Sequence, residues 1–114
     1  MVVSASQALS SYVRKRDEGK PCISCGEYKP LQAGHYLSVG ARPELRFHAE
    51  NVHGQCSRCN IDLAGNRKAF YFGLVERYGL EYVDRLDCYN TTRKTTIDDL
   101  KELTKQYNEA EKML

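Results

Sequence analysis

The sequence lacks several features that would assign it to a broad class of proteins. It has no tryptophan and no apolar run long enough to cross a bilayer, which excludes a membrane-spanning helix. Its start, Met-Val-Val-Ser-Ala-Ser, has neither the charged region nor the apolar block of a secretory signal. Internal repeats and low-complexity tracts are also missing. These absences predict a folded protein in the reducing cytoplasm.

Size and charge set further bounds. At 114 residues with 41% hydrophobic residues, the chain can form one domain with a modest core, and a bound metal would help so short a chain fold. The net charge of +2 says little by itself. The segment from Arg14 to Lys68 contains ten Lys and Arg and six Asp and Glu, so the positive excess lies in this part of the chain. This excess is typical of a solvated surface or of a polyanion-binding one.

Five cysteines are present, and four of them form two closely spaced pairs. Cys22 and Cys25 make the first pair, and Cys56 and Cys59 the second. Two residues between cysteines let both sulfurs of a tight turn reach one ion, so the pairs predict a structural Zn²⁺. Two disulfides or a redox-active pair are the alternatives. The odd fifth thiol argues against a secreted disulfide framework, and Cys88 is expected to be a small buried hydrophobe.

The hydrophobic pattern predicts an α+β fold, in which a β-hairpin between the cysteine pairs has helices on both sides. The first strand is expected at residues 31–38, and the returning one at 46–48 and 51–53. Residues 1–90 would form the zinc-stabilised domain, and 91–114 a helix that packs on it or on a partner. Helices are expected at 4–18, 57–63, 66–78 and 80–88, and from Thr95 or Thr96 onward.

Three polar residues near the cysteines are candidates for chemistry, and each also has a structural interpretation. His35 can act as a general base near neutral pH, although a lone histidine is usually structural. Asn60 follows the last cysteine and can offer an amide oxygen to Mg²⁺, or it can cap a helix. Asn51 can hydrogen-bond the backbone of the strand that carries His35, or it can be a turn residue.

Taken together, these pieces resemble a known arrangement. A CxxC pair is followed by a histidine in a hairpin, an asparagine five residues before a second CxxC, and an asparagine directly after it. This order resembles the HNH or ββα-metal endonuclease core with a zinc clamp, a treble-clef-like fold. The segments Cys-Ile-Ser-Cys-Gly, Ala-Gly-His-Tyr, Leu-Arg-Phe, Asn-Val-His-Gly-Gln-Cys and Cys-Asn-x-x-x-x-Gly-Asn are similar to the lambdoid phage NinG (Rap) family.

The resemblance implies roles for individual residues. His35 would be the general base, Asn51 the brace of the motif, and Asn60 a ligand of the catalytic cation, Mg²⁺ or Mn²⁺. The four paired cysteines would bind the structural zinc. NinG-like proteins are recombination endonucleases of phage-infected bacteria, so the implied substrate is branched DNA such as a Holliday junction or D-loop.

One position departs from the pattern. Many HNH enzymes place Asp or His directly before the base as a second cation ligand, and here that residue is Gly34. Gln32, Glu50 and His53 are candidates to complete the shell. Because His53 is two residues from Asn51 in the same strand, it shares a strand face with it and is the preferred candidate.

Two further expectations concern partners. No segment resembles a base-reading helix, which suits recognition of DNA shape, and a two-fold symmetric junction would suit a homodimer. A zinc-stabilised DNA-binding module without activity is the alternative function, favoured by Gly34, and a protein-interaction zinc domain is a third. Phosphate contacts are expected from Arg42, Arg46, Arg58, Arg67 and Lys68.

Overall fold

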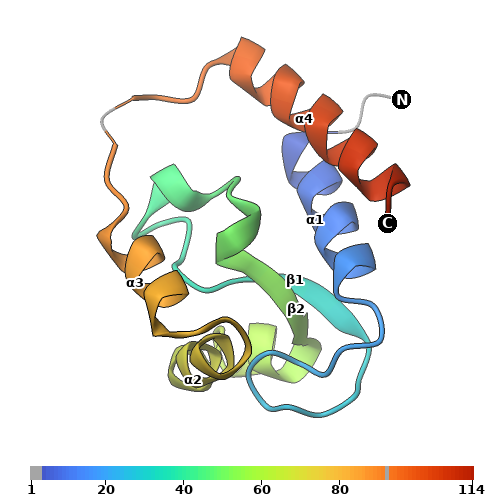
Figure 1. Cartoon of the computed structure of the whole chain (residues 1–114), viewed down its shortest axis with the longest axis vertical. Helices are drawn as coiled ribbons and strands as arrows, with labels where there is room; N and C mark the ends of the chain where they lie inside the picture. The colour runs from blue at the N-terminus through green and yellow to red at the C-terminus, as the bar shows by residue number, and fades with distance from the viewer. Residues whose placement is uncertain (1–3, 92) are drawn as a thin grey trace.

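The computed structural model describes residues 4–91 and 93–114, and their fold is α+β (Figure 1). An antiparallel two-stranded hairpin lies at the centre with helices on both sides, and none of the helices in these ranges is long and apolar enough to cross a membrane. The elements in order are α1 (Ala5–Arg16), β1 (Leu31–His35), η1 (Pro43–Leu45), η2 (Ala49–Asn51), β2 (Val52–Cys56), η3 (Arg58–Asp62), α2 (Arg67–Tyr78), α3 (Leu80–Cys88) and α4 (Ile97–Lys112).

Helices form at the predicted places, although α1 ends at Arg16 and not at residue 18, and the short helix expected at 57–63 is a π-helical turn, η3. The first and last helices begin with the expected caps. Ser4 and Gln7 form a capping box at the start of α1, with the Gln7 backbone N–H donating to the Ser4 hydroxyl. Thr96 and Asp99 form the same motif at the start of α4. Gly79 separates α2 from α3 at a positive φ of 96°, a conformation that glycine adopts readily.

The hairpin is shorter than the sequence predicted. β1 pairs with β2 from Leu31 opposite Cys56 to His35 opposite Val52. The first strand was expected to reach residue 38, but it ends at His35 because Asn51 then binds the next two residues. The expectation of a strand at residues 46–48 is also wrong, because η1 and η2 turn the chain there.

The two faces of the hairpin pack against different helices. On one face, Val52 forms an apolar cluster with Leu9 and Val13 of α1. The other face turns toward α2 and α3, where Phe70 lies 6.1 Å from the His53 ring, between centroids. Figure 1 shows the hairpin between these two layers. Along β1, Gln32 and Gly34 share the α2-facing side, since alternate residues of a strand point the same way.

The two edges of the hairpin also differ. On the outer edge of β2, the Gly54 N–H donates to Asp17 Oδ2 at 2.8 Å, and the Ile23 N–H donates to the Gly54 carbonyl at 3.0 Å. Within residues 4–91 and 93–114, β1 pairs with no strand other than β2. The outer edge of β1 is therefore not covered by another strand.

Two close contacts complete the fold. A Cβ on Gly73 would lie 1.8 Å from the Ile23 carbonyl oxygen, so only glycine lets α2 approach the first cysteine turn this closely. The last helix, α4, packs along α1 within the same chain (Figure 1), where the Tyr12 and Tyr107 ring centroids are 5.6 Å apart. The Tyr107 hydroxyl donates to the Phe47 carbonyl, which ties α4 to the loop that joins the strands.

Candidate metal centre and the polar face of the hairpin

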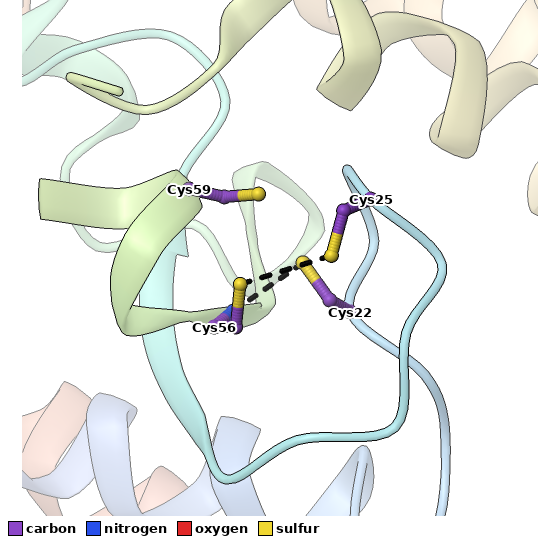
Figure 2. A group of neighbouring side chains, drawn as sticks. All are labelled: Cys22, Cys25, Cys56 and Cys59. Atoms are coloured by element: carbon purple, nitrogen blue, oxygen red, sulfur yellow. Dashed lines mark hydrogen bonds between the residues drawn. The ribbon is translucent and has the colours of Figure 1, made fainter. Parts of the chain in front are cut away.

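The four paired cysteines converge on one point, as Figure 2 shows. Their sulfur atoms all lie within 4.8 Å of one another, and Cys25 Sγ is 3.8 Å from Cys56 Sγ. Zinc–sulfur bonds of about 2.3 Å in a tetrahedron place sulfurs about 3.8 Å apart, whereas a disulfide needs about 2.05 Å. All five cysteines are free thiols. The four could therefore hold a metal such as zinc, and no disulfide joins them in this structure.

The electrostatics of the thiols also favour a cation. Burial acts to raise the pKa of Cys22, but backbone N–H groups, including that of Cys56 at 3.3 Å from its sulfur, lower it below its ordinary value. Burial and the neighbouring sulfurs raise the pKa of Cys59. Four thiols this close together cannot all ionise without a cation, because the thiolates would repel one another. A bound divalent cation would offset this repulsion. The expectation for Cys88 is wrong: it is exposed.

His35 ends β1 and lies against the loop that follows. Its Nε2 is 2.9 Å from the Arg46 carbonyl oxygen. A carbonyl only accepts, so this contact requires a proton on Nε2 and leaves the lone pair of the neutral ring on Nδ1. The ring is partly exposed. His35 can therefore accept a proton at Nδ1 while the Arg46 carbonyl fixes the orientation of its ring.

Asn51 is fully buried and braces the chain directly after His35. Its Oδ1 accepts from the Leu37 N–H at 2.9 Å, its Nδ2 donates to the Leu37 carbonyl at 3.0 Å, and its carbonyl accepts from the Tyr36 N–H. Arg16 donates to the carbonyls of Ala49 and Val52, on either side of Asn51. The segment that orients His35 is thus held from two directions.

Asn60 lies in η3 and contacts the α2-facing side of β1. Its Nδ2 donates to Gln32 Oε1 at 2.9 Å. Both side chains are partly exposed. Asn60 makes no direct hydrogen bond to His35 within the described part of the chain, and alternation places the His35 side chain on the other face of β1.

The structure does not bring His53 to His35. Gly34 is opposite His53 and Val52 is opposite His35, so the two imidazoles lie on different faces of the hairpin. His53 is buried, with Nε2 2.8 Å from the Glu50 carbonyl and Nδ1 3.2 Å from Arg16 Nη2. Burial, reinforced by the nearby Arg16 charge, lowers the pKa of His53 to about 4.

With both ring nitrogens engaged, His53 has no free lone pair for a cation. Glu50 is a poor alternative, because its carboxylate is exposed and lies 3.9 Å from Arg85. The sequence-based preference for His53 as the second cation ligand therefore has no support in this geometry.

The place of a side chain at residue 34 is filled by a cross-strand neighbour. A Cβ on Gly34 would lie 2.2 Å from Oε1 of Gln55. This oxygen is buried and has no hydrogen-bond partner, whereas Nε2 of the same amide donates to Ser24 Oγ at 2.8 Å and to the Gly65 carbonyl at 2.6 Å. The hairpin thus presents three carboxamides on one face, from Gln32, Gln55 and Asn60.

The predicted phosphate-binding residues divide into two groups. Arg42 donates to Glu44 and to the carbonyls of Asp87 and Tyr89, so its guanidinium holds the end of α3 and is not free for phosphate. The other four are exposed: Arg46, Arg58, Arg67 and Lys68. The Arg46 carbonyl contacts His35, and the Arg67 guanidinium carbon lies 5.7 Å from the ring centroid of Tyr36, the residue after His35.

Comparison with known proteins now decides the family. The profile described as "Bacteriophage Lambda NinG protein" matches residues 2–114. The chain belongs to the NinG family. "Protein ninG" of Escherichia phage lambda is 36% identical over 110 residues, and so is that of Salmonella phage P22; in each case 95% of this chain and 54% of the relative are covered. "Protein ninG" of Escherichia phage 933W is 35% identical over 110 residues, with 95% and 55% covered.

The NinG-family chain spans about half the length of these curated relatives. No solved structure matches it. Sequence reasoning missed two buried residues of this NinG fold, Asp17 and Gln55, and it missed the inward hydrogen bonds of Arg16. Charged and polar residues normally point to solvent, and no periodic pattern marks the ones that fold inward. One signal was available for Gln55: it is two residues from His53 in a strand that ends at the predicted metal ligand Cys56, so both side chains should point to the same face.

Proposed function

We propose that this NinG-family chain is a metal-dependent, structure-selective DNA endonuclease of the HNH type that acts on branched recombination intermediates. The observation that carries the proposal is the cysteine cluster between the first cysteine turn and the end of β2. It fastens a hairpin carrying His35 and Asn51 to a helical turn carrying Asn60. The three polar residues of the family-like motif are thereby held on one rigid unit.

The roles follow from what each side chain can do. His35 takes a proton from water through Nδ1, since its Nε2–H is directed at the Arg46 carbonyl. Asn51 keeps the His35 segment in place through its bonds to Leu37. Asn60 offers its amide oxygen to a Mg²⁺ or Mn²⁺, which when bound would stabilise the charge that builds up on the phosphate.

Among the described residues, one edge of β1 pairs with no other strand, and this edge supports the same proposal. His35 and Asn60 lie on opposite faces of β1, and a DNA backbone that runs along this edge would lie beside side chains of both faces, because alternate residues of a strand point to opposite sides. The side chains of Arg46 and Arg67 are exposed and lie over the Phe47 and Tyr36 rings, and we expect them to contact phosphates. Phosphate contacts without base reading suit a substrate that is recognised by shape, and a two-fold symmetric junction suits a homodimer.

Cleavage of labelled branched and linear DNA with Mg²⁺ or Mn²⁺ tests the proposal. His35→Ala should lose about 100-fold or more in cleavage rate, the usual contribution of a general base, while DNA binding is retained. His48→Ala is the matched control, because the His48 ring packs on Tyr89 with centroids 4.7 Å apart and is assigned no role. Equal losses in the two variants would contradict the assignment.

A zinc-stabilised DNA-binding module without activity is the second candidate. It is favoured by Gly34, whose side-chain space is filled by Gln55, so that residue 34 cannot provide a cation ligand. Binding to branched DNA without cutting, in the presence of every divalent ion tried, would establish this alternative.

A further inference from the structure

We propose that Tyr107 of the last helix, α4, is a positioning residue for His35. Its hydroxyl holds the loop whose backbone carbonyl orients the imidazole, so α4 takes part in the site although it carries no residue of the family-like motif. The inference rests on the proposed function, because the orientation of His35 matters for cleavage only if His35 is the general base.

The loop between η1 and η2 meets the imidazole and α4 through two consecutive carbonyls. The Arg46 carbonyl oxygen lies 2.9 Å from His35 Nε2, and the Phe47 carbonyl accepts from the Tyr107 hydroxyl. Each peptide unit is planar, so only the two backbone dihedral angles of Phe47 separate these carbonyls. When the Phe47 carbonyl is held, the Arg46 carbonyl has few orientations left, and the ring that donates to it is held as well.

Tyr107 is itself fixed in place. Its ring packs on Tyr12 of α1, with centroids 5.6 Å apart, and against the apolar cluster that contains Val52. Burial raises the pKa of Tyr107, in spite of a hydrogen bond from the Ala49 backbone that acts to lower it. The hydroxyl therefore keeps its proton at neutral pH. It donates from a position that is set by the packing of α4 along α1, which Figure 1 shows.

The two ends of this loop are held without α4. The Leu45 carbonyl accepts from Asn51 Nδ2 at 3.4 Å. The Ala49 carbonyl accepts from Arg16 Nη1 at 3.1 Å. Loss of the hydroxyl on α4 should therefore loosen the middle of the loop, which contacts the imidazole, and leave both ends in place. The expected consequence is a change in the orientation of His35 in a protein that remains folded.

The test compares Tyr107→Phe with Tyr12→Phe. Each substitution keeps the two packed rings and removes one hydroxyl, but the Tyr12 hydroxyl makes no hydrogen bond within the described part of the chain. The first readout is ¹³C relaxation of the His35 ring in zinc-loaded protein without DNA. The order parameter should be near the rigid value of about 0.85 in wild type and in Tyr12→Phe, and should fall toward about 0.6 in Tyr107→Phe.

The second readout is the cleavage of branched DNA. Tyr107→Phe should cut about tenfold more slowly or worse at saturating DNA, with unchanged DNA affinity, because a misplaced base slows the chemical step and does not weaken binding. Tyr12→Phe should cut at the wild-type rate. Circular dichroism and zinc content establish whether each variant is folded.

The outcomes separate this inference from the endonuclease proposal. The inference is overturned if the ring mobility of His35 is the same in both variants, or if Tyr107→Phe does not fold, since the hydroxyl would then support the fold as a whole. If the ring becomes mobile but wild type cuts no DNA, Tyr107 orients His35 and the endonuclease proposal fails. If DNA is cut in a His35-dependent manner while both variants cut at the wild-type rate, the endonuclease stands and Tyr107 is not a positioning residue.

Discussion

The two faces of the hairpin are built on opposite physical principles. The face toward α1 is apolar, with Val52 packed on Leu9 and Val13. The face toward α2 buries His53 and Gln55, and each makes directed hydrogen bonds. An apolar contact tolerates small shifts, whereas a buried polar group must meet its partner or it destabilises the fold. The polar face therefore needs a cross-link that holds β2 in a fixed position relative to the segments around it. The four cysteines, at the first cysteine turn, the end of β2 and η3, are placed to provide it.

The largest expected effect comes from removing that cross-link. Structural zinc in small domains contributes about 10–16 kcal/mol of folding free energy. Treatment with a strong chelator should therefore unfold the protein, because the polar face cannot form without it. Hydrogen exchange measures the loss of protection at each backbone amide after chelation. Native protection in β2 after chelation would show that the apolar face alone holds the hairpin.

The apolar face is tested by Leu9→Ala. Leu9 is buried, and shortening such a side chain costs about 2–5 kcal/mol through lost burial and a residual cavity. Urea denaturation of the zinc-loaded protein measures the loss, and zinc affinity should remain close to that of wild type. Leu80→Ala is the matched control, because Leu80 is 52% exposed, and should change stability by less than about 0.5 kcal/mol. A large loss of zinc affinity in Leu9→Ala would mean that the two faces are coupled.

A smaller effect is expected from Gln55→Met on the polar face. Methionine fits a similar volume but leaves the Gly65 carbonyl without its donor, which costs about 1–3 kcal/mol for a buried group. Urea denaturation again gives the change in stability. Gln106→Met removes an amide from the surface and should be neutral. Equal stability of both variants would show that the buried amide contributes nothing to the fold.

The last effect depends on pH: protonation of His53 does not change the stability at neutral pH and lowers it only in acid. Burial lowers the pKa of His53 from 6.5 to about 4, so the unfolded chain binds this proton more readily than the folded one. The His53 contribution is therefore fully present above pH 6.5 and is lost as the pH falls toward 4. An NMR titration of the His53 ring should place its midpoint near 4. A midpoint near 6.5 would mean that the ring is solvated.

Much of the fold could be predicted from local signals. The paired cysteines indicated the four-cysteine cluster, and the capping residues Ser4 and Thr96 marked where two helices begin. The hairpin between the cysteine pairs was also expected. Strand ends were not predictable, because β1 stops where the side chain of Asn51, distant in sequence, takes the next backbone groups.

The candidate site was predicted only in part. His35, Asn51 and Asn60 were identified as a motif, and Asn51 does brace the His35 segment. Arg42 was predicted to contact phosphate, but it is hydrogen-bonded to the end of α3. His53 was predicted to bind the cation, but it is buried against Tyr82. Sequence patterns report which residue types occur and how they are spaced, and they do not report which polar groups fold inward.

By itself, the sequence determined the family, the α+β class and the set of four clustered cysteines, since these depend on residue type and on spacing along the chain. Only the tertiary structure decided that Gln55 fills the space beside Gly34, that Gln32 meets Asn60, and that His53 faces away from His35. Each of these contacts joins residues on different segments of the chain. Their distances are set by the register of the strands and by the packing of helices against them, which no local pattern encodes.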